Sequence, residues 1–215
     1  MDLIKNLIYP SLGLCLICKE EDKSGRHMCI ACRENLEIVN GEIELYSPYI
    51  KNAYYSVFYN RFIREVIKDY KFKGKNYLYK ALAELMIDTI RQYDLKADIL
   101  IYIPIHRRKE AIRGYNQAAL LALYISKSLN MPLIESNLIK YKSTKDQSHS
   151  DKYDRSRNLV DSFKILKPFE VRDKEILLID DIVTTGATME EASKVLIESG
   201  AKKVSGLAIT SSTNI

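Results

Sequence analysis

The stretch LLIDDIVTTGATMEEA, residues 177–192, decides the fold. Apolar residues lead into the adjacent Asp180 and Asp181, and a threonine-rich turn around Gly186 then enters a helix that begins near Thr188. In open sheets of parallel strands, ligands bind at the carboxyl ends of the strands. A turn at that edge and the helix N-terminus behind it present backbone N–H groups to an anion. The stretch therefore predicts an anion-binding site.

The two acidic residues narrow the choice of ligand. Adjacent carboxylates beside such a turn bind ribose hydroxyls, or a divalent cation directly or through water. Gly186 lets the backbone approach the anion, and Thr184, Thr185 and Thr188 add hydroxyl donors. The chain has neither the Gly-Lys-Ser/Thr of a Walker A loop nor the GxGxxG dinucleotide fingerprint at this place. The predicted ligand is a sugar phosphate.

Strands and helices are predicted to alternate along the rest of the chain. Apolar strands with helical crossovers indicate a parallel sheet covered on both faces, which places the protein in the α/β class. No run of 18 apolar residues exists, so a membrane-spanning helix is not expected. Residues 33–52 are predicted to be a connector with a short hairpin or irregular strand, and 142–158 a loop. We predict strands over 53–59, 97–104, 137–141, 175–181 and 203–210, and helices over 61–72, 76–93, 115–129 and 188–199, the last stopped by Gly200.

All four cysteines lie near the N-terminus, in two pairs with two-residue spacing. Two such knuckles complete a tetrahedral thiolate site that suits structural Zn²⁺. A disulfide framework is the alternative, and the cytoplasmic setting expected for this chain disfavours it. A closed site with four thiolates has no open position, so we expect the metal to stabilise the fold and not to catalyse. The predicted ligands are Cys15, Cys18, Cys29 and Cys32.

The N-terminus and the length suggest how the chain is divided. The first residues lack a basic leader followed by a continuous apolar segment, so we expect no signal peptide and a cytoplasmic location. The 215 residues allow one ordinary domain with a small appendage. We predict a zinc-ribbon-like module and connector over 1–50 and the main domain over 51–215.

Positive charge is concentrated in three segments. The net charge is +5, and residues 60–75, 104–117 and 137–158 carry local excesses of +4, +3 and +3. Such clusters suit a polyanionic ligand. The basic face of the predicted helix 61–72 is either a solvated surface or a nucleic-acid contact, with nearby tyrosines able to stack on bases. The candidate nucleic-acid residues are Arg61, Arg64, Lys68, Lys71 and Lys75.

Three stretches resemble known families. LLIDDIVTTGAT resembles the phosphoribosyl-pyrophosphate motif of type I phosphoribosyltransferases. IPIHRRKEAIRGYNQAALLA (103–122) and STKDQSHSDKYDRSRNLVDSF (143–163) are similar to two blocks of the ComF family of competence proteins. With the four cysteines, the resemblance spans residues 15–210. It implies a type I phosphoribosyltransferase-like parallel sheet flanked by helices, with a small N-terminal zinc-ribbon module.

The resemblance also implies roles for individual residues. Asp180 and Asp181 would bind the ribose hydroxyls as the catalytic pair. The 5-phosphate would be cradled by Val183, Thr184, Thr185, Gly186, Ala187 and Thr188. The pyrophosphate and its Mg²⁺ would meet Ile105, His106 and Arg107, beside an anion-facing loop with Arg113, Asn116 and Gln117. A lid would carry Lys145, Gln147, Arg155, Arg157 and Asn158.

Three functions follow from these patterns. The first is a phosphoribosyltransferase that moves ribose 5-phosphate to an unidentified acceptor. Displacing pyrophosphate needs no covalent nucleophile, so Mg²⁺, basic groups and exclusion of water would supply catalysis. The second is a DNA-uptake factor for natural transformation that binds single-stranded DNA and works with other competence proteins, such as a DNA-translocating helicase. The third is a sensor that binds phosphoribosyl pyrophosphate without turnover.

Overall fold

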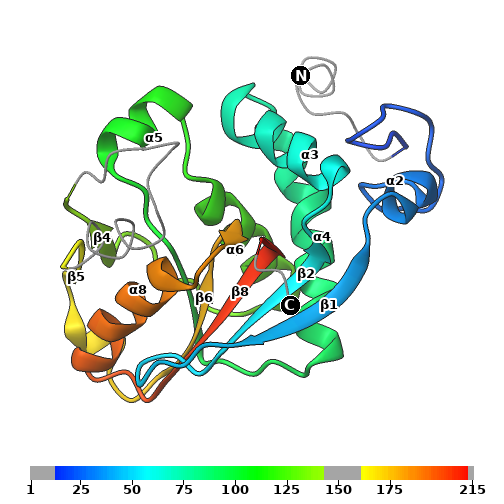
Figure 1. Cartoon of the computed structure of the whole chain (residues 1–215). Helices are drawn as coiled ribbons and strands as arrows, with labels where there is room; N and C mark the ends of the chain where they lie inside the picture. Colours follow the sequence, from blue (N-terminus) through cyan, green and yellow to red (C-terminus); the bar gives the residue numbers. More distant parts are fainter. Residues whose placement is uncertain (1–12, 143–160, 213–215) are drawn as a thin grey trace.

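The computed structural model describes residues 13–142 and 161–212, and its centre is a six-stranded sheet. The strand order is β1-β2-β8-β6-β3, and β7 pairs with β8 (Figure 1). The pairs β2·β8, β8·β6 and β6·β3 are parallel, as predicted, whereas β1 runs antiparallel to β2 at the edge. The strands are β1 Ile38–Glu44, β2 Asn52–Phe58, β3 Ile99–Tyr102, β6 Glu175–Ile179, β7 Ile182–Val183 and β8 Lys203–Ser211.

Helices cover both faces of the sheet, and this explains the apolar strands. In β6, Leu177 and Ile179 pack into a core with α3, α4 and α6, while Ile176 and Leu178 pack into a second core with α8. Successive strand residues point to opposite faces, so a strand buried on both sides is apolar throughout. The helices are α2 Ile30–Glu34, α3 Arg61–Phe72, α4 Tyr79–Gln92, α5 Arg107–Arg113, α6 Gln117–Leu129 and α8 Ala187–Glu198, with 3₁₀ turns η1 Asn76–Leu78 and η2 Pro168–Glu170.

Two features depart from the elements expected from the sequence. The segment after β3 forms helix α5, although the pattern indicated a loop there. None of its residues is buried, so it lacks apolar periodicity; His106 caps its start and Gly114, with φ +79°, ends it. Strand β4 (Leu138–Lys140) lies within the strand predicted over 137–141. It pairs antiparallel with β5 (Phe163–Ile165) in a separate two-stranded sheet, and neither β5 nor this pairing was predicted.

The cysteine-bearing segment packs directly on helices α3 and α4. Cys15 and Cys32 lie in the same core as residues of α3 and α4, and Figure 1 shows α2 beside these helices. Polar contacts add to this packing. Glu84 of α4 accepts a hydrogen bond from the His27 backbone N–H (3.1 Å), and its other carboxylate oxygen lies 2.6 Å from His27 Nδ1. Asp88, one turn further along α4, pairs with two arginines of the segment, Arg26 (3.1 Å) and Arg33 (3.0 Å).

Candidate active site

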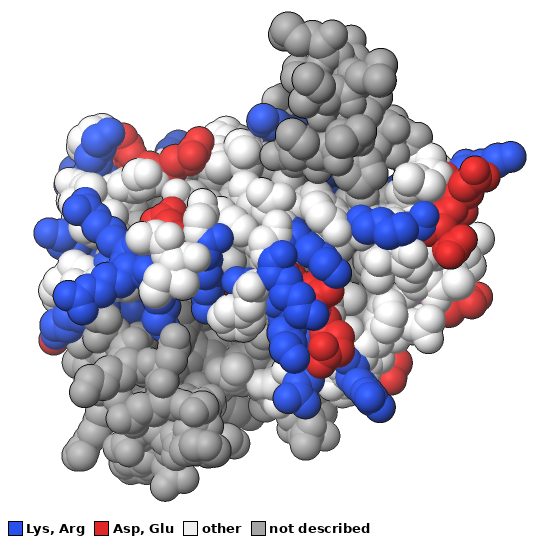
Figure 2. Space-filling view, turned by 90° about the horizontal axis from the view of Figure 1, so that it is seen from above, with Lys and Arg blue, Asp and Glu red and all other residues white. Residues whose placement is uncertain are grey.

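A cleft of about 150 Å³ opens at the carboxyl ends of β3 and β6. Figure 2 looks down on this face and shows Lys and Arg side chains concentrated on its left half, the side of α5 and β4. Basic groups and the two aspartates meet in the cleft. Its polar and charged lining residues are Lys71, His106, Lys109, Arg113, Asn116, Gln117, Lys140, Asp180, Asp181 and Thr188.

Asp180 and Asp181 are fixed by backbone pairing with β8. The Asp180 N–H donates to the Leu207 carbonyl (2.9 Å), and the Asp181 carbonyl accepts from the Ile209 N–H (3.2 Å). Asp180 Oδ1 in turn accepts a hydrogen bond from the Asp181 N–H (2.8 Å). Strand β6 ends at Ile179, two residues before the predicted end. Asp180 and Asp181 follow it, line the cleft and are half-buried.

The electrostatic environment of the pair is unusual. Burial, and then the negative charge of Asp181, raise the pKa of Asp180 to about 8, although the nearby Lys71 and Lys140 oppose this shift. The Lys71 ammonium lies 2.7 Å from Asp181 Oδ2. A proton or a bound cation at this pair therefore relieves repulsion between two neighbouring carboxylates.

The turn after the aspartates requires glycine. Gly186 has φ +79°, and a Cβ atom there would lie only 2.5 Å from Leu45 Cδ2. Its carbonyl accepts the Glu190 N–H (2.8 Å), so α8 starts at Ala187 without a side-chain cap from Gly186. Thr184 and Thr185 are exposed and Thr188 lines the cleft, while Val183 is buried in strand β7.

Asn116 and Gln117, which follow β3 and α5, line the cleft but form most of their hydrogen bonds within the protein. Asn116, expected to face an anion, mainly caps α6: its Oδ1 accepts from Ala118 N–H (2.9 Å) and its Nδ2 donates to the Ile103 carbonyl (3.1 Å). Gln117 is 1% exposed, and its Oε1 accepts from Arg113 Nη1 (3.0 Å). Gln117 Nε2 has no hydrogen-bond partner among the described residues.

The predicted pyrophosphate residues divide between two cavities. Ile105 and His106 line the cleft, whereas Arg107 lines only the adjoining cavity over β4. Lys109 and Lys140 also reach the cleft. Both belong to basic segments that the charge pattern singled out, but their positions in the cleft depend on the folding of α5 and β4. The predicted lid residues, Lys145, Gln147, Arg155, Arg157 and Asn158, lie outside the described residues.

The candidate nucleic-acid residues on and just after α3 do not share one environment. Arg61 and Arg64 are exposed, Lys68 lies 3.8 Å from Glu65, and Lys75 pairs with Asp69 (2.6 Å). Lys71 belongs to the cleft and not to the exposed face expected for it. It follows the buried Ile67 by four residues, and residues four apart share a face of a helix.

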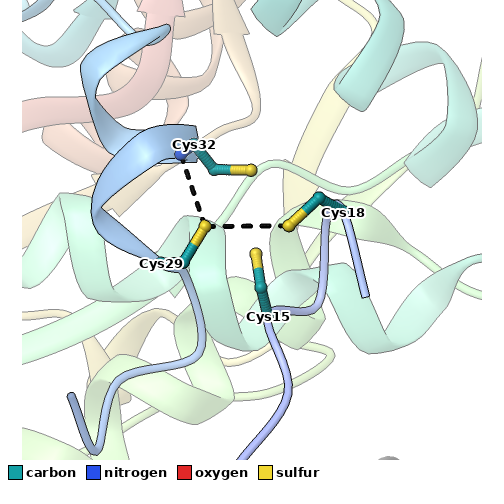
Figure 3. A group of neighbouring side chains, drawn as sticks. All are labelled: Cys15, Cys18, Cys29 and Cys32. Carbon is teal, nitrogen blue, oxygen red and sulfur yellow. Dashed lines mark hydrogen bonds between the residues drawn. The ribbon is translucent and has the colours of Figure 1, made fainter. Parts of the chain in front are cut away.

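The four cysteines form one cluster, as predicted. Their Sγ atoms all lie within 4.8 Å of one another and point toward a common centre (Figure 3). Cys18 and Cys29 have their sulfurs 3.7 Å apart, which matches the edge of a tetrahedron with Zn–S bonds of about 2.3 Å. Burial opposes ionisation of the Cys15 thiol, but hydrogen bonds from the Cys29, Cys18 and Ile17 amides lower its pKa to about 7, whereas burial raises the pKa of the Cys18 and Cys32 thiols. The spacing of the four sulfurs fits a metal with thiolate ligands.

The parallel strands, the paired carboxylates and the glycine-led turn define an α/β protein with a cleft for an anionic ligand. The chain belongs to the phosphoribosyl transferase domain family, whose model matches residues 75–210. This match confirms the fold class expected from the stretch at 177–192. Within the described residues, no helix is long and apolar enough to cross a membrane.

The chain is also similar to curated proteins along most of its length, which confirms the resemblance to competence proteins. It is 28% identical to Competence protein F of Haemophilus influenzae, over 93% of this chain and 90% of that protein. Competence protein ComFC of Bacillus subtilis is 29% identical, over 90% and 82%. A solved structure of glutamine phosphoribosylpyrophosphate amidotransferase from B. subtilis is 18% identical and covers 60% of this chain and 26% of that one, with a TM-score of 0.41.

Replacing Asp180 by asparagine should alter the pH dependence of stability. The pKa of Asp180 is raised from its ordinary 3.8 to about 8, so its contribution to stability is complete below pH 3.8 and is lost as the pH rises toward 8. Asp180→Asn removes this loss and keeps an acceptor for the Asp181 N–H. Each pKa unit corresponds to about 1.4 kcal/mol, so the variant should exceed wild type at pH 8 by at least about 1.4 kcal/mol.

Urea unfolding of both proteins at pH 5 and pH 8 measures this difference. Asp173→Asn is the control, because Asp173 is an exposed turn residue with φ +59°. The gap between Asp180→Asn and wild type should widen from pH 5 to pH 8. A constant gap would show that Asp180 is ionised over the whole range.

Replacing Cys15 by serine should release the metal. Cys15 is fully buried in the core shared with α3 and α4, so loss of the metal also loosens that core. We expect zinc content to fall from one ion per chain to near zero, and the free energy of unfolding to fall by about 3 kcal/mol or more. Elemental analysis and urea unfolding test this, with the exposed Lys23→Ser as control. Unchanged zinc content would exclude Cys15 as a ligand.

Proposed function

We propose that the protein binds phosphoribosyl pyrophosphate with Mg²⁺ in this cleft and transfers ribose 5-phosphate to an acceptor. The observation that carries the proposal is the placement of Asp180 and Asp181 between the turn at Gly186 and a cluster of basic side chains. Phosphoribosyl pyrophosphate has the matching arrangement, with two ribose hydroxyls between a 5-phosphate and a pyrophosphate. Carboxylates accept hydrogen bonds from the hydroxyls, and cations attract the two anionic ends.

The residues divide the work as follows. Asp180 and Asp181 hold the ribose hydroxyls and fix the orientation of the ring. The backbone from Val183 to Thr188 holds the 5-phosphate at the start of α8. His106, Lys109 and Arg113 face the pyrophosphate, whose charge grows as the bond to C1 breaks. The buried Gln117 Nε2 supplies a further donor to the ligand.

The acidic pair also fits the metal that the family implies. Carboxylate oxygens are the ligands that Mg²⁺ prefers, and Asp180 and Asp181 both line the cleft. Bound Mg²⁺ neutralises charge on the leaving pyrophosphate. The side chains of Asp180 and Asp181 would hold it directly or through water.

A second candidate function is binding of single-stranded DNA. Two observations favour it. The relatives include competence proteins and a DNA utilization protein of Escherichia coli, which is 24% identical over 89% of this chain and 87% of that protein. In addition, Arg61 and Arg64 are exposed on α3. Tyr59, which is 39% exposed, precedes the same helix and offers a ring for stacking. DNA uptake would then use the fold as a binding platform, with phosphoribosyl pyrophosphate as substrate or regulator.

Removing both carboxylates should abolish sugar-phosphate binding. We expect Asp180→Ala with Asp181→Ala to weaken phosphoribosyl pyrophosphate binding at least about 100-fold, because both carboxyl groups that accept hydrogen bonds from the ribose hydroxyls are lost. Isothermal titration calorimetry in Mg²⁺ measures the affinity, and circular dichroism verifies the fold. Asp94→Ala, at a side chain that is 79% exposed, is the control. Wild-type affinity in the double variant would contradict the assignment.

Turnover is tested separately by following pyrophosphate release from wild type with Mg²⁺ and with either nucleobases or single-stranded DNA as acceptors. Release that depends on one acceptor identifies the substrate. Binding without release in any mixture would reject transferase activity and leave the sensor function.

Salt titration tests the DNA-binding function. Affinity for single-stranded DNA should fall as salt rises, and Arg61→Ala with Arg64→Ala should reduce the slope of log affinity against log salt by about 1 to 2, since each phosphate contact contributes somewhat under 1. Lys96→Ala, at a side chain that is 81% exposed, is the control. Affinity that does not change with salt would contradict phosphate contacts by α3.

A further inference from the structure

Helix α3 supplies a side chain to the cleft from outside the part of the chain that matches the family model. That match begins at residue 75, whereas α3 ends at Phe72. Lys71 Nζ nevertheless lies 2.7 Å from Asp181 Oδ2, and the two side chains are only 17% and 14% exposed. The ion pair therefore lies inside the cleft.

The end of α3 is hydrogen-bonded to residues 115–117 at the start of α6. The buried Tyr70 donates its hydroxyl hydrogen to the Gln117 carbonyl (2.8 Å), and the Tyr115 hydroxyl donates to the Tyr70 carbonyl. The Arg113 guanidinium lies 5.0 Å from the centre of the Phe72 ring. These contacts hold the backbone of Lys71 in place, so its ammonium group can move only through its own side-chain torsions.

The position of this ammonium group matters when a ligand arrives. Ribose hydroxyls or a divalent cation that engage Asp181 compete with Lys71 for the same carboxylate. An ammonium group with so little exposure is costly to leave without an anionic partner. Among the described residues, the charged side chains that line the cleft are the two aspartates, Lys71, Lys109, Arg113 and Lys140. The phosphoryl oxygens of the ligand are then the nearest additional anions for Lys71.

We propose that Lys71 is a ligand-binding residue of this site: its ammonium group contacts Asp181 in the free protein and passes to a phosphoryl oxygen of phosphoribosyl pyrophosphate in the complex. This inference rests on the proposed function of the cleft. It makes α3 part of the site and gives Lys71 two opposing effects. Lys71 competes with a divalent cation that binds alone, and it strengthens the binding of the phosphorylated sugar.

Lys71→Met separates these effects, because methionine keeps most of the volume and removes the charge. Binding of phosphoribosyl pyrophosphate in Mg²⁺ should weaken about 10- to 100-fold, the effect of losing one charge-assisted hydrogen bond. Binding of Mn²⁺ alone, followed by electron paramagnetic resonance of the free ion, should become tighter by about tenfold, the effect of removing one nearby competing charge. A purely structural role would weaken both.

Two matched variants complete the experiment. Lys71→Arg keeps a cation and should bind phosphoribosyl pyrophosphate within a few-fold of wild type. Lys68→Met, on the exposed face of the same helix, should match wild type for both ligands. If Lys71→Met binds the sugar phosphate as well as wild type, or if Lys71→Arg binds it as weakly as Lys71→Met, the inference is wrong. Weaker Mn²⁺ binding by Lys71→Met would also overturn it.

The wild-type titration separates this inference from the function on which it rests. If wild type fails to bind phosphoribosyl pyrophosphate, the proposed function fails, and the inference fails with it. If wild type binds and Lys71→Met is unchanged, only the inference fails.

Discussion

Two adjacent carboxylates must lie half-buried at the end of a central strand, and much of the structure around the cleft accommodates that constraint. Backbone bonds to Leu207 and Ile209 of β8 hold Asp180 and Asp181 where the chain leaves the sheet. Burial and mutual repulsion make two charges there unfavourable, which is why the pKa of Asp180 rises to about 8. Lys71 partly compensates, and a ligand or metal would complete the compensation.

The N-terminal part of the chain is linked to the cleft through helices α3 and α4. The cysteine cluster packs on α3 and α4, and Glu84 and Asp88 of α4 add polar contacts to the same segment. Helix α3 in turn carries Lys71, and its Tyr70 is hydrogen-bonded to Gln117 at the start of α6 and to Tyr115 in the loop before it. A metal that orders the cysteine segment would therefore also support the helix that carries Lys71. The cysteine cluster and the cleft are thus linked through α3.

Basic groups from α5, β4 and α3 surround the paired aspartates in the cleft, and Figure 2 shows Lys and Arg side chains over the wider face. A ligand with separated anionic groups and neutral hydroxyls between them satisfies both parts at once.

The sequence by itself determined the elements whose physics is local. The apolar run before Asp180, the glycine at position 186 and the spacing of the cysteines each indicate a structure within a few neighbouring residues, and the fold class, the turn and the cysteine cluster agree with it. Three outcomes were decided only by the tertiary structure. The Asn116 side chain caps α6, α5 forms without a buried residue, and Lys71 forms an ion pair with Asp181. These outcomes depend on segments far apart in the chain, and a pattern along the sequence carries no information about which of them touch.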